Sequence, residues 1–244
     1  MARSIGVYCR APSITQGYQY MEQVNDLLLQ VRTAHRLIAA YYQRVVPTIA
    51  EMASKLELTF CYWGNADFAL TPATHRNITE YWQWDLLPGM NSHYLYSQFQ
   101  LANNKVRIGD YLVEFIVVSD TGVDSHGNGH KSEPDALNLP LAVDKAQSVL
   151  RVVVCAPYQT FEESWYSNIW SGVHYPDFSS NPTPAKDKND EPCFLSGYEC
   201  SLAELMSEAG VEQIIERVKQ HITDTVAAAK AEYERVAGGQ GVAS

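Results

Sequence analysis

The residue types best suited to chemistry gather in one glycine-rich stretch of this chain of 244 residues. Asp120, Asp124, His126 and His130 lie within eleven positions. Carboxylate and imidazole groups bind zinc, manganese or iron, and a glycine-rich loop could wrap such an ion. Gly127, Asn128 and Gly129 disfavour the helix on which two histidines one turn apart would bind zinc. A solvated polar loop is the alternative interpretation of the same residues.

Acid–base chemistry has weaker support in the sequence. Glu114, Asp120 and Asp85 could supply a carboxylate pair, but nothing in the sequence places them together. The chain has no serine-hydrolase elbow and no glycine-rich phosphate loop. Cys193 and Cys200 lie in an acidic segment, which disfavours a reactive thiolate. His221 falls within a predicted helix, where packing or solvation is the simpler role.

Aromatic side chains at predicted strand ends and in loops form a third group of candidates. Such residues stack on ligands or anchor protein contacts, although they also fill cores. The candidates for partner or ligand contact are Trp82, Trp84, Trp165, Tyr166 and Trp170.

A long helix is predicted over about residues 16–56 by apolar residues spaced alternately by three and four. His35 is the polar member of this stripe and could act as a ligand or a pH switch. Pro47 interrupts the helix or kinks it, and the unbroken stripe favours one kinked helix. The stripe predicts either packing on the chain's own sheet or a seam with a partner. Its members are Met21, Val24, Leu28, Val31, His35, Ile38, Tyr42, Val45, Ile49, Met52 and Leu56.

The strands are predicted in the region of residues 56–158. Runs rich in β-branched and aromatic residues indicate strands at about 56–63, 92–100, 105–120 and 148–158. Asn103-Asn104 predicts a hairpin between the second and third. Glu114 and Arg151 each stand alone inside an apolar strand, and we expect them to form a structural ion pair.

Two long connections and C-terminal helices complete the predicted architecture. The connections cover residues 121–147 and 159–200, and the helices cover about 201–237. A capping box at residues 201–204 begins the first of these helices. The whole chain, residues 1–244, is predicted to be one α+β domain: an antiparallel sheet of about four to five strands flanked by the N- and C-terminal helices.

Charge and composition narrow the functional classes. The net charge is −10, which makes direct nucleic-acid binding unlikely and disfavours anionic membranes. No apolar run is long enough to cross a bilayer. Five cysteines without a C-x-x-C pair, and no secretory signal, predict a cytoplasmic protein. Charge is uneven: residues 1–56 hold six basic against three acidic residues, whereas residues 157–210 hold two against nine.

Three functions remain open on these observations. The preferred one is a non-enzymatic binding or regulatory protein without a cofactor, which engages another protein or itself, such as an inhibitor of a partner with a basic surface. The second is a metal-dependent hydrolase or nuclease that uses zinc or manganese in the loop from Asp120 to His130. The third is a small-ligand or nucleotide-binding protein with an aromatic-lined pocket.

Overall fold

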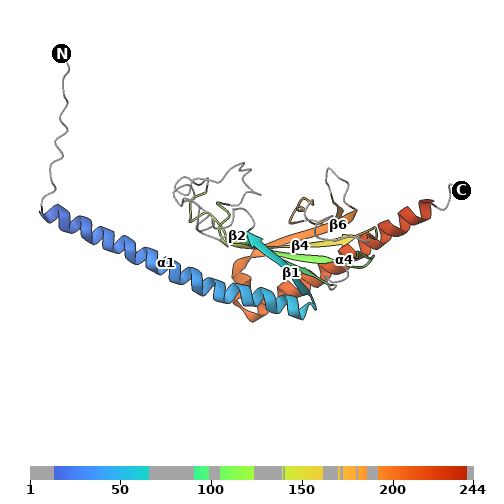
Figure 1. The fold of residues 1–244 in the computed structure, drawn as a ribbon, viewed down its shortest axis with the longest axis horizontal. Coiled ribbons are helices and arrows are strands. Elements are labelled where there is room, and N and C mark those ends of the chain that lie inside the picture. The colour runs from blue at the N-terminus through green and yellow to red at the C-terminus, as the bar shows by residue number, and fades with distance from the viewer. Residues whose placement is uncertain are drawn as a thin grey trace, which may run out of the picture. The chain divides into compact units, whose positions relative to one another are not determined.

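A computed structural model of the chain describes residues 14–65, 91–98, 105–123, 139, 141–161, 170, 173–179, 181–185 and 192–240. Along the chain, helix α1 comes before the described strands and helix α4 comes after them (Figure 1). The elements are α1 (Ile14–Lys55), β1 (Thr59–Asn65), β2 (Asn91–Ser97), β3 (Leu112–Val118), β4 (Val149–Pro157), β5 (Thr183–Pro184), β6 (Cys193–Ser201), the 3₁₀ helix η5 (Leu202–Met206) and α4 (Glu208–Gln240).

Helix α1 continues through Pro47, as the unbroken stripe predicts. Pro47 removes one backbone hydrogen bond of the helix. Because Pro47 is exposed, water can bond to the carbonyl group that loses its partner. The chain divides at this residue into two compact units, Met1–Pro47 and Thr48–Ser244. The assignment of the whole chain to one domain stays a prediction.

The sheet is antiparallel throughout, with the strand order β1-β2-β3-β4-β6-β5. The α+β fold with flanking helices is therefore confirmed, with six strands among the described residues in place of about four to five. The predicted antiparallel pairing of the second and third strands is also confirmed, since Ser97 of β2 pairs with Leu112 of β3. The predicted turn at Asn103-Asn104 lies outside the described residues. Strand β5 and all of β6 except Ser201 lie inside the segment 159–200 that we predicted as a connection, so that prediction is corrected.

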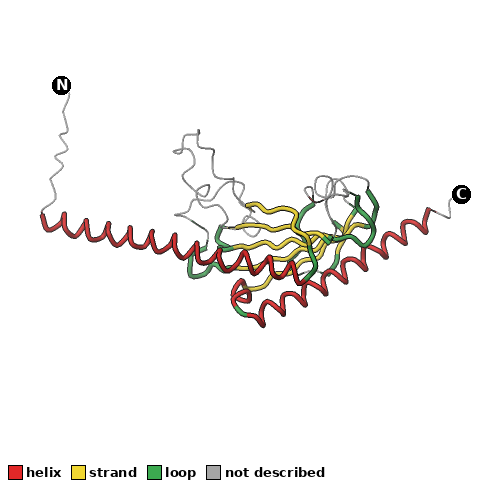
Figure 2. The backbone as a smooth tube through the Cα atoms, turned by 60° about the horizontal axis from the view of Figure 1, so that its bottom comes forward, coloured by secondary structure: helices red, strands yellow, loops and turns green. Residues whose placement is uncertain are grey.

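Helix α4 covers one face of the sheet (Figure 2). On this α4 face, the Tyr198 hydroxyl of β6 donates a hydrogen bond to the Ile214 carbonyl oxygen of α4, at 3.3 Å. The Ser196 and Thr225 hydroxyls, one from each element, lie 2.7 Å apart, and both residues are fully buried. The Nδ1 atom of His221 lies 3.0 Å from the same Ser196 oxygen. These polar contacts fix the position of α4 along β6 within an otherwise apolar interface.

The opposite sheet face, which we call the connection face, carries Leu112, Glu114 and Ile116 of β3. Alternate residues of each strand point to this face, and the register places Val153 of β4 directly beside Glu114. Described parts of the connection from 159 pack on it, as expected. The buried cluster contains Leu95, Val106, Leu112, Ile116, Val118, Val149, Val153, Cys155, Trp170, Cys193 and Leu195, with Phe161, Val173, Tyr175 and Phe178 packed against it.

Candidate functional site

A histidine and a glutamate meet on the connection face. The Nδ1 atom of His93, from β2, lies 2.6 Å from Oε1 of Glu114 in β3. The backbone register makes the two residues diagonal neighbours, because Glu114 pairs directly with Leu95. The Glu114 side chain is fully buried, whereas the His93 side chain keeps 18% of its surface exposed. The imidazole ring therefore bridges a buried carboxylate and the solvent.

The contact with Glu114 determines the tautomer of a neutral His93 ring. A carboxylate only accepts hydrogen bonds, so Nδ1 carries the hydrogen and Nε2 keeps its lone pair. The other carboxylate oxygen, Oε2 of Glu114, is buried and has no hydrogen-bond partner within the described part of the chain. Buried polar atoms without a partner are rare in proteins, and a role in a functional site is one explanation for such an atom.

Two residues of β1 complete this cluster. The Tyr62 and His93 rings meet edge to face with centroids 5.5 Å apart. A Cβ atom on Gly64 would lie 2.8 Å from His93 Nε2 and 2.8 Å from the Tyr62 hydroxyl oxygen. A side chain at position 64 would therefore displace these two polar atoms, which lie over the backbone of the edge strand. We call His93, Glu114, Tyr62 and Gly64 the histidine site.

The expected ion pair between Glu114 and Arg151 is corrected to two separate pairs. The register does place both residues on the connection face, but each has a different partner among the described residues. Arg151 Nε donates to Glu199 Oε2 at 2.7 Å, across the β4–β6 ladder. The Arg151 guanidinium also lies over the Phe178 ring, 4.8 Å from its centroid. Arg151 is therefore neutralised by its directly paired neighbour Glu199, whereas Glu114 bonds to its diagonal neighbour His93 on the other side of β3.

The predicted metal loop lies mostly beyond the described residues. Asp124, His126 and His130 are outside them, as is Asp85. Asp120 is described, and its Oδ1 accepts a hydrogen bond from the Gly122 backbone N–H at 2.7 Å, which closes a tight turn. No group of three metal-binding side chains occurs within the described ranges. The metal hypothesis stays a prediction.

Of the five aromatic candidates for partner or ligand contact, only Trp170 is described; Trp82, Trp84, Trp165 and Tyr166 lie outside the described residues. Trp170 is 8% exposed, belongs to the buried cluster of the connection face and lies against the Tyr175 ring. Its position indicates a core role.

The apolar stripe of helix α1 has an exposed first part and a buried last part. Ile49 and Met52, beyond Pro47, are fully buried. Val45, just before the proline, is also buried at 1% exposure, whereas the earlier members Leu28, Val31 and Ile38 are 48%, 44% and 42% exposed. We call Leu28, Val31, His35 and Ile38 the exposed stripe; Val24 and Tyr42, at its two ends, are half-buried. A helix in water normally buries an apolar face of this kind.

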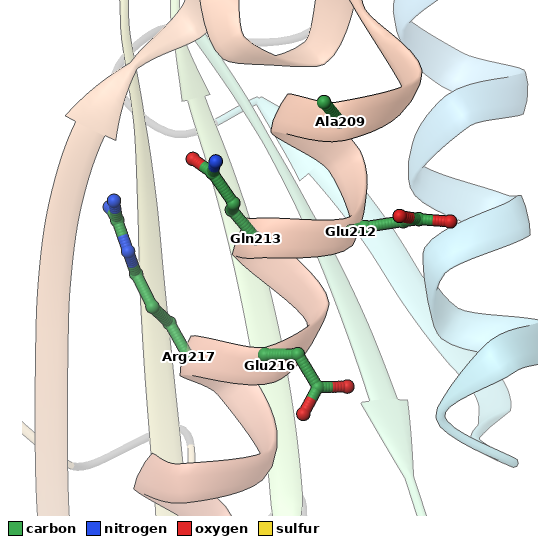
Figure 3. Close-up of a pocket in the computed structure, with 5 residues that line it drawn as sticks. All are labelled: Ala209, Glu212, Gln213, Glu216 and Arg217. Carbon is green, nitrogen blue, oxygen red and sulfur yellow. The ribbon is translucent and has the colours of Figure 1, made fainter.

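A shallow groove on α4 is the other feature of the described surface. Figure 3 shows Gln213 and Arg217 on one side of the helix and Glu212 on the other; Ala209 and Glu216 complete the lining. Arg217 already lies 3.7 Å from Glu204. Charged residues of this kind are typical of a solvated helix surface, and the groove carries no functional assignment. None of the helices in the described chain has the length and apolar character needed to cross a membrane.

The comparisons with known proteins agree on one family. No solved structure matches this chain. It is similar to the uncharacterized protein PM0109 of Pasteurella multocida (strain Pm70), with 24% identity over 200 residues, which are 81% of this chain and 93% of that protein. A family model described as PM0109 matches residues 21–227, a range that includes the exposed stripe, the sheet and most of α4. The chain therefore belongs to the PM0109 family.

Proposed function

We propose that this chain is a protein-binding protein that associates with a second copy of itself through the exposed stripe of α1. The observation that carries this proposal is the exposure of Leu28, Val31 and Ile38 on one face of a helix whose later residues are buried. Burying a side chain of this size contributes about 1.5–3 kcal/mol. A helix without tertiary partners is only marginally stable in water, so a second helix would also stabilise α1 itself.

The spacing of the stripe supports another helix as the partner. Alternate steps of three and four give a period of 3.5 residues, which supercoils two helices around each other. Positions beside the seam are mostly uncharged, as at Ala34, Ala39 and Tyr41. In coiled coils, charged residues beside the seam normally select a different chain as the partner. Because such charges are scarce here, the apolar seam itself determines the pairing.

The order of charges along α1 supports a second copy in particular. Acidic Glu22 and Asp26 come first, and basic Arg32, Arg36 and Arg44 follow. Two copies that lie antiparallel would place the acidic start of each helix beside the basic end of the other. This arrangement reduces repulsion between the copies and favours their encounter.

Two adjacent leucines provide a matched test. Leu28 lies on the exposed stripe, whereas Leu29 lies off it and is similarly exposed, at 48% and 55% respectively. We expect Leu28→Lys to weaken association at least tenfold, since about 1.4 kcal/mol corresponds to a factor of ten. Leu29→Lys should associate as the wild type does.

Sedimentation equilibrium over a wide concentration range measures the association of the three proteins. A wild-type chain that stays monomeric at the highest concentration would contradict the proposal. So would an equal loss of association in both variants, because a specific seam distinguishes the two positions.

A further inference from the structure

The histidine site has the parts of a general base, independently of any association through α1. His93 Nδ1 is bound by Glu114, which leaves the Nε2 lone pair as the proton acceptor. A base held by a third group is the arrangement that proton-transfer catalysis uses. The carboxylate stabilises the imidazolium ion that forms when Nε2 takes a proton, as in hydrolytic triads.

The burial of Glu114 is costly for a residue with only a structural role. It occupies the middle of β3, where all seven residues are buried. Its Oε2 atom has no hydrogen-bond partner among the described residues. An unsatisfied buried polar atom costs about 1–3 kcal/mol. An apolar residue would avoid that cost, so the carboxylate is better explained by what it does to His93.

The surroundings of Nε2 indicate the kind of substrate. The Tyr62 hydroxyl lies beside it over Gly64, and Tyr62 and the His93 side chain are 42% and 18% exposed. A phenolic hydroxyl can donate a hydrogen bond to a carbonyl oxygen. The Glu114 carboxylate disfavours an anionic substrate at this position. A neutral carbonyl compound fits both features.

We propose that the histidine site hydrolyses neutral carboxylic esters, with His93 as the catalytic base and Glu114 as its positioning residue. Nε2 takes a proton from water while the water oxygen bonds to the ester carbonyl carbon. The Tyr62 hydroxyl donates a hydrogen bond to the carbonyl oxygen as it becomes negative. The carbon–oxygen bond to the leaving group then breaks, and the leaving alkoxide takes the proton from Nε2. The products are a carboxylic acid and an alcohol.

The test uses p-nitrophenyl acetate as the probe and the full chain as the enzyme. We expect His93→Gln to lower the rate of nitrophenolate release about 10²-fold or more, the lower range for general-base catalysis. The glutamine amide can still donate to Glu114, so the fold is retained. His174→Gln is the matched control, because His174 is an exposed histidine outside both the histidine site and the exposed stripe. We expect this control to leave the rate unchanged.

Two further measurements separate catalysis from packing. Long-range proton–nitrogen NMR should show the hydrogen of the neutral His93 ring on Nδ1, and Glu114→Gln should shift the pH profile of the rate. Tyr62→Phe, at a half-exposed position, should slow the reaction while the protein stays folded. A wild-type rate equal to that of His93→Gln, or a neutral ring with its hydrogen on Nε2, would overturn the proposal.

Discussion

Two isoleucines of α1 test whether one part of the stripe packs in the chain's own core and the other part binds a second copy. Ile49 is fully buried, whereas Ile38 is 42% exposed. Replacing a buried isoleucine with alanine costs about 2–5 kcal/mol, because packing is lost and a cavity remains. Ile49→Ala should therefore reduce the free energy of unfolding by that amount at every protein concentration. Ile38→Ala should cost less than about 1 kcal/mol in the separate chain, since much of its surface is already in water.

Concentration distinguishes the two variants. If a second copy covers Ile38, the loss caused by Ile38→Ala grows as the protein becomes concentrated, because association stabilises the folded state by mass action. Urea unfolding, followed by circular dichroism at several protein concentrations, measures both effects. Equal losses from Ile38→Ala and Ile49→Ala in dilute protein would refute the division of the stripe. A loss at Ile38 that does not depend on concentration would refute association there.

Two more predictions concern groups on or beside the α4 face. Burial lowers the pKa of His221 from its usual 6.5, against a smaller opposing effect of Asp224. The neutral ring therefore contributes its full stability above about pH 6.5, and this contribution is lost as the pH falls through the pKa of the folded state. His221→Gln should make the urea midpoint depend less on pH below about 6.5. An unchanged pH dependence of the urea midpoint would contradict this prediction. Burial and, to a lesser extent, Glu204 raise the pKa of Cys200 to about 12. Iodoacetamide at pH 8 should therefore label Cys200 far more slowly in the folded chain than in urea, and similar rates would show that the thiol is accessible and ionised.

The main strands were predictable because their sequences leave few alternatives. The residues of β3 and β4 are β-branched or aliphatic along almost their whole length, as strands buried on both faces must be. Strand β6 escaped prediction, since its sequence, C-F-L-S-G-Y-E-C-S, mixes small, polar and aromatic residues. Gly197 in its middle lowers strand propensity further. Pairing with buried β4 along nine residues compensates for that weakness, and this is tertiary information.

The contact between His93 and Glu114 was only partly accessible from the sequence. A two-residue turn at Asn103-Asn104 would already place His93 opposite Glu114 on the same face. The structure keeps the face and shifts the register by two residues, so that Leu95 lies opposite Glu114 and His93 becomes a diagonal neighbour. Our expectation paired Glu114 with Arg151 because they are opposite charges, each alone inside one of two strands that could pair. The sequence contained no sign that Glu199, in an unrecognised strand, would neutralise Arg151 instead.

Helix α1 shows what a periodic pattern can and cannot predict. The heptad spacing identified the helix and its apolar face, because periodicity depends only on helix geometry. It could not show where the chain's own core stops covering that face, since the residue types before and after Pro47 are the same. Val31 and Ile49 are both β-branched stripe residues, yet one is 44% exposed and the other fully buried. The second α1 helix that we propose would match the same seven-residue repeat, because it has the same sequence.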